Sequence, residues 1–187
     1  MKSIDSSIPL LERTFYFMRH GETETNRLMT IAGSTDVELN DAGRAQAGAA
    51  IERVRPLGIT QVASSGLRRA RDTAAIVAGA LKLPHIVVPG LAERNWGVLE
   101  GKPQSLRERG VTPPGAETAE QFIARTRAAL ATIDARGVPL IVAHSGTYRV
   151  LCRLLALEGA AEAVANCRPV RFAPPASAGG VWSINFL

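Results

Sequence analysis

The sequence predicts an α/β protein, a three-layer α/β/α sandwich with a mainly parallel central sheet. Residues 14–18 and 140–143 form short runs that are almost wholly apolar, as in strands buried on both faces. Along the chain, strand-like segments alternate with longer helical patterns, which is typical of crossover connections between parallel strands. These two observations indicate one sheet with helices on both of its faces.

Capping and turn residues set the limits of the expected elements. Asn40 is a suitable N-cap, Ser64 and Ser65 are expected to cap a second helix, and residues 118–121 match a capping box for a helix that Gly137 ends. We therefore expect strands at residues 14–18, 59–63, 85–88 and 140–143, helices at 40–56, 66–81, 118–136 and 146–157, and weaker strands near 170–172 and 181–186.

The length of 187 residues suits a single domain, which we place at residues 13–187. Residues 1–12 hold no long apolar run and are expected to form a flexible N-terminal extension. The apolar run at residues 8–11 is too short for a signal peptide, and no stretch reaches membrane-spanning length. We therefore expect a cytoplasmic protein that does not bind membranes.

The formal net charge of +5 favours anionic partners. Because the arginines are dispersed and no basic tail is present, we expect small anions rather than nucleic acid.

Cys152 and Cys167 have no zinc or redox spacing and are expected to be buried thiols. A homodimer is compatible with the sequence, although no motif indicates one.

Three of the expected strands end in residues suited to catalysis. They are Arg19 and His20 after the first strand, Ser64 and Ser65 after the second, and His144 and Ser145 after the fourth, with Arg68 one helical turn beyond Ser65 and Glu93 a few residues beyond the third strand. Parallel strands bring these ends to one edge of a sheet, where ligands of α/β proteins bind. His85 opens a strand away from that edge and is interpreted as structural.

This set of side chains favours an anionic substrate. Guanidinium groups match the geometry of phosphate, and the two helices that begin at the same edge favour negative charge. The carboxylate cluster of a magnesium or calcium site is missing, a zinc site lacks its third ligand and spacing, and no Walker loop is present. We expect no metal and no cofactor, and phosphoryl transfer through a phosphohistidine fits the residues.

The motifs of the chain resemble those of the histidine phosphatase superfamily, also called the phosphoglycerate mutase-like family. The motifs in family order are RHGET at residues 19–23 with Asn26, LNDAG at 39–43, SSGLRRA at 64–70 with Thr73, LAE at 91–93 with Trp96 and Gly97, EG at 100–101, PGAET at 114–118 and AHSG at 143–146. The match covers about residues 13–157. It departs from the family pattern at Thr25, Gly66, Ala116 and Ser145, and none of these departures removes a group that handles protons or phosphate.

The resemblance implies a role for each matching position. It implies that His20 is the nucleophile that becomes phosphorylated and that Glu93 is the proton donor. The phosphate pocket that it implies consists of Arg19, Arg68 and His144. Asn26 and Thr23 are the implied substrate-binding residues, and we expect Ser145 to bind substrate as well.

We expect a metal-independent phosphomonoester hydrolase, an acid-type histidine phosphatase that acts on a small phosphorylated metabolite. The segment between Glu93 and Pro114 is short, and a short lid admits water that hydrolyses the phosphoenzyme. A cofactor-dependent phosphoglycerate mutase and an α-ribazole phosphatase are the alternatives within the family. A phosphate-binding regulatory module is the alternative outside enzymes.

Overall fold

The structure is a computed structural model and describes residues 7–157, 164–177 and 180–187. Within these ranges, strands form one six-stranded sheet in the order β3-β2-β4-β1-β5-β6. The strands are β1 (Phe15–Arg19), β2 (Gln61–Ser65), β3 (His85–Val88), β4 (Pro139–Ala143), β5 (Pro169–Ala173) and β6 (Ser183–Phe186). The first four are mutually parallel, and β5 and β6 pair antiparallel.

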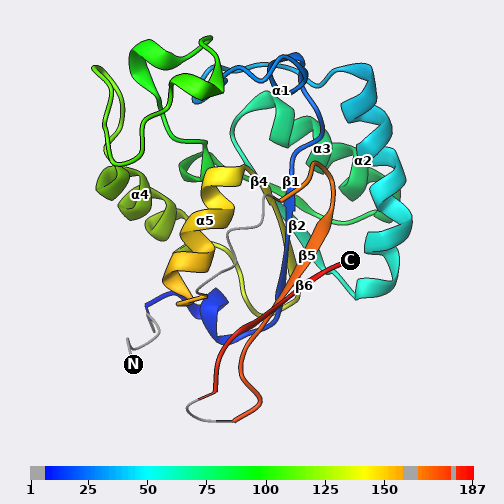
Figure 1. The fold of residues 1–187 in the computed structure, drawn as a ribbon. Helices are drawn as coiled ribbons and strands as arrows, with labels where there is room; N and C mark the ends of the chain where they lie inside the picture. The colour runs from blue at the N-terminus through cyan, green and yellow to red at the C-terminus, as the bar shows by residue number, and fades with distance from the viewer. Residues whose placement is uncertain (1–6, 158–163, 178–179) are drawn as a thin grey trace.

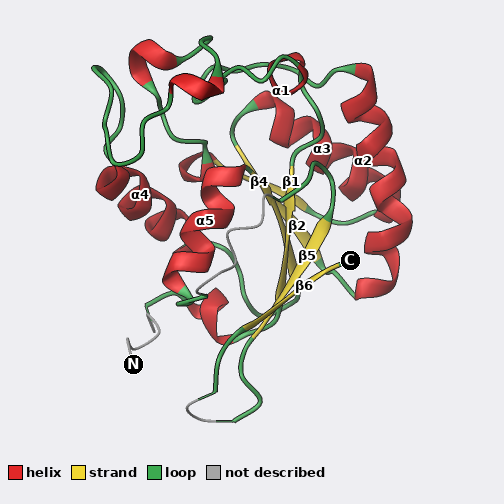
Figure 2. Cartoon of the chain, viewed as in Figure 1, coloured by secondary structure: helices red, strands yellow, loops and turns green. Residues whose placement is uncertain are grey.

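Helices cover both faces of the sheet, which confirms the predicted α/β/α sandwich (Figure 1, Figure 2). One face carries α2 (Asp41–Val54) and α3 (Arg68–Leu81), and the other carries α4 (Ala119–Ala131) and α5 (Ser145–Leu154). Each layer has its own apolar cluster. Phe17, Leu130 and Leu151 belong to the cluster under α4 and α5, whereas Val62 and Val77 belong to the one under α2 and α3.

Two of the predicted caps are present in the structure. The Asn40 side chain accepts the backbone N–H of Gly43 and starts α2, as the sequence predicts. Thr118 and Gln121 form a reciprocal capping box at the start of α4. Each cap satisfies helix N–H groups that would otherwise lack a partner.

Other predicted boundaries of helices and strands are wrong. Ser64 and Ser65 lie inside β2, and α3 begins only after Leu67, whose side chain provides no cap. Helix α4 ends at Ala131 rather than near Gly137, and the short helix α1 (Glu24–Arg27) interrupts the expected polar loop.

The prediction of a flexible segment at residues 1–12 is wrong for its second half. Residues 1–6 lie outside the described residues, but Pro9–Glu12 forms a 3-10 helix. Ile8, Leu10 and Leu11 are fully buried in the cluster under α4 and α5. The apolar run is therefore part of the core.

No helix among the described residues has the length and hydrophobicity needed to cross a membrane.

The parallel topology brings the carboxyl ends of β1, β2 and β4 to one edge of the sheet. His20 follows β1, Ser65 ends β2, and His144 follows β4. The loops after β1 and β3 gather above the same edge in Figure 1. The sheet thus brings together residues that lie more than a hundred positions apart in the chain.

Candidate active site

The His20 imidazole is buried and held on both of its nitrogens. Its Nδ1 lies 2.7 Å from the carbonyl oxygen of Gly21, and Nε of Arg69 lies 3.3 Å from its Nε2. A carbonyl only accepts and a guanidinium only donates, so one neutral tautomer satisfies both contacts. In that tautomer Nδ1 carries the proton and Nε2 keeps a lone pair that faces Arg69.

The environment of His20 also keeps it neutral. Burial lowers its pKa well below the ordinary value, and the charges of Arg69 and Arg19 lower it further, against the hydrogen bond to Gly21. The pKa of His144 is lowered in the same way, by burial and then by Arg69 and the other neighbouring cations. A neutral imidazole is the form that can attack phosphorus.

Arg69, and not Arg68, is the guanidinium beside His20. Arg69 is only 1 % exposed, and its terminal nitrogens donate to the carbonyl oxygens of Gly33 and Thr35. The Arg68 side chain is 52 % exposed and pairs with Glu38. The structure therefore corrects the sequence assignment by one position along α3.

The orientation of α3 explains this correction. Arg68 lies on the solvent face of the helix, where it also pairs with Asp72 one turn later. Arg69 lies on the face of the buried Thr73, which accepts the N–H of Gly21 through its hydroxyl oxygen. The pair of opposite charges four residues apart at 68 and 72 is the sequence signal for the solvent face.

His144 contacts both His20 and the end of β2. Its ring centroid lies 5.1 Å from that of His20, and its Nε2 lies 2.8 Å from Oγ of Ser65. That hydroxyl oxygen already accepts the N–H of Leu67, so its own proton is available to His144 Nε2. Ser65 is thus a positioning residue for the imidazole rather than the helix cap that the sequence predicts.

Two buried nitrogens in this region have no hydrogen-bond partner among the described residues. They are Nε of Arg19 and Nδ1 of His144. Arg19 donates to the carbonyl oxygen of Val164, and Asn166 donates to the carbonyl oxygen of His20. Buried polar groups are normally paired, so such nitrogens beside His20 indicate a place for an anion that accepts hydrogen bonds.

Glu93 lies against the first turn of α5. One carboxylate oxygen accepts the N–H of Arg94, and the other accepts the N–H of Gly146. A Cβ at Gly146 would overlap the Glu93 carboxylate, so the absence of a side chain there permits this close approach. Arg125, which is paired with Glu117, donates to the carbonyl oxygen of Glu93 and fixes its backbone.

The three expected substrate-binding residues differ in position. Asn26 and Ser145 line the cavity described below. Thr23 is fully buried and caps the short helix α1, so the structure gives it a structural role instead of a contact with substrate. Asn26 completes the same capping box by accepting the N–H of Thr23.

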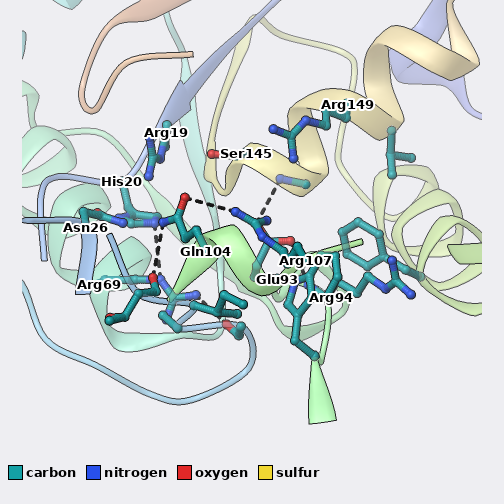
Figure 3. A pocket seen from close by; sticks show the side chains of 18 of the residues that line it. Arg19, His20, Asn26, Arg69, Glu93, Arg94, Gln104, Arg107, Ser145 and Arg149 are labelled. Atoms are coloured by element: carbon teal, nitrogen blue, oxygen red, sulfur yellow. Dashed lines mark hydrogen bonds between the residues drawn. The ribbon is translucent and has the colours of Figure 1, made fainter. Parts of the chain in front are cut away.

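A cavity of about 610 Å³ opens above His20. Figure 3 shows Arg19, His20, Asn26, Arg69 and Glu93 around it, with further arginines from the loop after β3 and from α5. The lining residues that sequence reasoning missed include Arg69, Arg94, Gln104, Arg107, Arg149, Arg153 and Asn166. No group of three or more side chains suited to a metal ion occurs in the described part of the chain.

Comparisons with known proteins agree on a family. Residues 15–168 match the model of the histidine phosphatase superfamily, branch 1. The chain is 35% identical over 165 residues to a probable phosphoglycerate mutase, GpmB, of Yersinia pestis, covering 79% of this chain and 77% of that protein.

Solved structures share the fold. A mycobacterial glucosyl-3-phosphoglycerate phosphatase is 25% identical with a TM-score of 0.78, over 92% of this chain and 97% of the other. TTHB049 from Thermus thermophilus is 28% identical with a TM-score of 0.72, over 84% of this chain and 92% of the other. With the motifs in family order, the family model matching most of its length and the same fold in its relatives, the chain belongs to branch 1 of the histidine phosphatase superfamily.

Proposed function

We propose that the protein is a metal-independent, acid-type phosphomonoesterase that hydrolyses a small phosphorylated metabolite through a phosphohistidine. The observation that carries this proposal is the neutral His20, which holds its proton on Nδ1 and whose Nε2 lone pair faces Arg69. Two buried nitrogens of the same region, Nε of Arg19 and Nδ1 of His144, lack partners among the described residues. This is the arrangement that attack on a phosphoryl group requires.

The reaction has two balanced steps. In the first, His20 Nε2 forms a bond to phosphorus while the phosphorus–oxygen bond to the leaving group breaks, and Glu93 gives its proton to the leaving oxygen. In the second, the Glu93 carboxylate takes a proton from water as the water attacks phosphorus and the nitrogen–phosphorus bond breaks. Inorganic phosphate and neutral His20 result.

The charged and polar groups around His20 stabilise the phosphoryl group in transfer. Its negative charge spreads over three oxygens, and fixed donors aimed at them supply most of the catalysis. Arg19, Arg69 and His144 are the proposed donors, and Asn26 and Ser145 are proposed to contact the substrate at the cavity wall. In this proposal Arg69 takes the role that the sequence assigned to Arg68.

Hydrolysis is favoured over return of the phosphoryl group because solvent reaches the cavity. Arg149 and Arg153 line it and are exposed. The name of the Yersinia relative, a probable phosphoglycerate mutase, supports isomerisation as the second candidate.

The first test compares two histidine variants on a panel of phosphomonoesters with EDTA present. His20→Ala is expected to abolish turnover and the acid-labile phosphoenzyme, because no nucleophile remains. His85→Ala is the matched control, since His85 bonds the Ser64 hydroxyl and does not line the cavity. Equal losses in both variants, or no phosphoenzyme in the wild type, would contradict the proposal.

A second test separates hydrolysis from isomerisation. The protein is incubated with 3-phosphoglycerate and a bisphosphate primer, and free phosphate and 2-phosphoglycerate are both measured. Release of phosphate in excess of 2-phosphoglycerate is the expected result. Dominant formation of 2-phosphoglycerate would establish the mutase instead.

A further inference from the structure

Asn166 lies at the centre of a chain of hydrogen bonds beside His20. Its amide nitrogen donates to the backbone carbonyl oxygen of His20 at 2.7 Å, and the same nitrogen lies 3.3 Å from Oδ1 of Asn26. Both asparagines line the cavity. Asn166 therefore contacts the backbone of the proposed nucleophile and also a side chain that is proposed to contact the substrate.

These contacts determine which end of the Asn166 amide faces His20. The carbonyl oxygen of His20 can only accept a hydrogen bond, so the NH2 group of Asn166 must face it. That group has two hydrogens, one for the carbonyl oxygen of His20 and one for Oδ1 of Asn26. If the amide turned over, its own oxygen would meet two other oxygens.

The amide of Asn26 is oriented in the same way. Its Oδ1 accepts the N–H of Thr23 at 3.2 Å as well as the NH2 group of Asn166. Two donors point at this end of the amide, so the NH2 group of Asn26 lies at the other end. No acceptor among the described residues contacts that NH2 group. Its hydrogens are therefore the donors that Asn26 offers to the cavity.

The backbone that carries Asn166 is attached to the end of β1. Asn166 forms an isolated parallel bridge with Arg19, and the N–H of Cys167 donates to the carbonyl oxygen of Arg19 at 2.9 Å. Val164 and Cys167, on either side of Asn166, are buried. In Figure 1 this segment reaches the carboxyl end of β1 just before β5 begins. Asn166 is thus held in place before a substrate binds, as a residue that orients another must be.

The peptide between His20 and Gly21 is held from two sides. Asn166 donates to its carbonyl oxygen, and Oγ1 of Thr73 on α3 accepts its N–H at 2.9 Å. The hydroxyl of Thr73 in turn donates to the carbonyl oxygen of Arg69. Thr73 therefore still holds the His20 peptide when Asn166 is replaced, whereas Asn26 loses one of the two donors that orient its amide.

We propose that Asn166 is a positioning residue for Asn26, whose NH2 group it keeps directed at the phosphoryl group on His20. This inference rests on the proposed function and adds a residue to it. Asn166 does not itself touch the phosphoryl group, because both of its amide hydrogens are used by His20 and Asn26. Without Asn166, the Asn26 amide can turn and present its oxygen to the anion, which repels it.

A double-mutant cycle on the two asparagines tests the proposal. The affinity for orthovanadate, which resembles a phosphoryl group in transfer, is measured by calorimetry. Asn26→Ala is expected to weaken binding about tenfold, because it removes a hydrogen bond to a charged group. Asn166→Ala is expected to weaken binding several-fold. The double variant should bind no more than about twofold more weakly than Asn26→Ala, because no Asn26 amide is left to orient.

Steady-state kinetics on one phosphomonoester provide a second measurement. Asn166→Ala is expected to lower kcat about tenfold with little change in KM, because a donor to the phosphoryl group acts mainly in the transition state. Asn166→Asp keeps the shape of the side chain but lacks the NH2 group, so it should be no more active than Asn166→Ala. It also takes the place of Asn166→Ala in the cycle if thermal melts show that the alanine variant is not folded.

Asn185→Ala is the matched control, because Asn185 is an exposed asparagine on β6 that does not line the cavity. It should leave both the vanadate affinity and the kinetics unchanged.

Losses of affinity that multiply in the double variant, or an Asn166→Asp protein with the affinity and kcat of the wild type, would overturn the proposal. Wild-type protein that does not bind orthovanadate would overturn it as well. The vanadate cycle requires no turnover. Failure of the proposed function is detected separately, as the absence of phosphate release and of phosphohistidine in the wild type, so the two failures are distinguishable.

Discussion

At the scale of single residues, two adjacent arginines on α3 have opposite environments. Arg69 is buried and donates to His20, and burial lowers its pKa to about 10, so it stays charged at neutral pH. Arg68 is exposed, and its contacts are surface ion pairs with Glu38 and Asp72. Surface pairs of this kind contribute about 1 kcal/mol or less.

This contrast predicts different effects on catalysis. Arg69→Gln is expected to lower kcat by about 10²- to 10³-fold, as the loss of one fixed donor to a transition state commonly does. Arg69→Lys keeps the charge but not the planar group, and it should fall between Arg69→Gln and the wild type. Steady-state kinetics on one phosphomonoester check both variants.

The matched control is Arg68→Gln, which should stay within about twofold of the wild type because it loses only surface contacts. Circular dichroism and thermal melts show whether each variant is folded. A folded Arg68→Gln protein with the larger loss would restore the original assignment of Arg68.

At the scale of elements, Glu100 joins two loops that surround the site. Its carboxylate accepts hydrogen bonds from the backbone N–H and hydroxyl groups of Ser34 and Thr35 and from the N–H of Trp96. Burial opposes ionisation of Glu100, but these hydrogen bonds outweigh it and lower its pKa. The loop at residues 33–35 in turn supplies the carbonyl oxygens that hold Arg69.

Glu100 is therefore a positioning residue for Arg69. Glu100→Gln keeps the shape of the side chain but replaces one acceptor oxygen with a donor that faces N–H groups. We expect a drop of about tenfold to a hundredfold in kcat/KM, because small displacements of catalytic groups have effects of this size. We also expect faster proteolysis within residues 95–107.

Glu108→Gln is the control for this prediction, because Glu108 is an exposed residue of the same loop. It should leave both the kinetics and the proteolysis pattern unchanged. If Glu100→Gln behaved like Glu108→Gln, the link between the two loops would have no role in positioning Arg69.

At the scale of the whole molecule, the buried histidines make stability depend on pH. The pKa values of His20 and His144 are both lowered well below 6.5 in the folded protein. The unfolded chain takes up protons at these imidazoles as the pH falls through about 6.5, and the folded protein does not. The free energy of unfolding therefore falls below that pH, by up to about 1.4 kcal/mol per pH unit for each histidine.

Urea unfolding at several pH values between 7.5 and 5 checks this prediction. The His20→Gln variant should show a shallower fall than the wild type, because one of the protons is no longer taken up on unfolding. His85 contributes in the same direction in both proteins, since burial lowers its pKa as well. Parallel curves for wild type and variant would show that His20 does not take part in this dependence.

Local patterns were sufficient for much of the fold and for part of the site. The strand before His20 and the strand before His144 are apolar throughout because helices cover both faces of the sheet, and that signal depends on sequence alone. The caps at Asn40 and Thr118 are likewise local. The convergence of His20 and His144 followed from the parallel topology and is present in the structure.

Contacts between distant segments decided the rest, because the sequence does not encode them locally. Arg68 and Arg69 are adjacent on α3 and therefore point about 100° apart, and only the packing of the helix decides which of them faces His20. The packing of residues 8–11 into the core depends on an apolar surface that only the assembled sheet and helices provide.

The sequence by itself determined the sandwich and the family, because periodicity and motifs can be recognised in the sequence alone, and it predicted His20 as the nucleophile. The tertiary structure alone decided which arginine contacts His20, what holds Glu93 and Arg69 in place, and where Asn166 lies relative to Asn26. These features arise from contacts between side chains that are distant in the sequence. Such contacts form only in the folded protein, and no local sequence pattern specifies them.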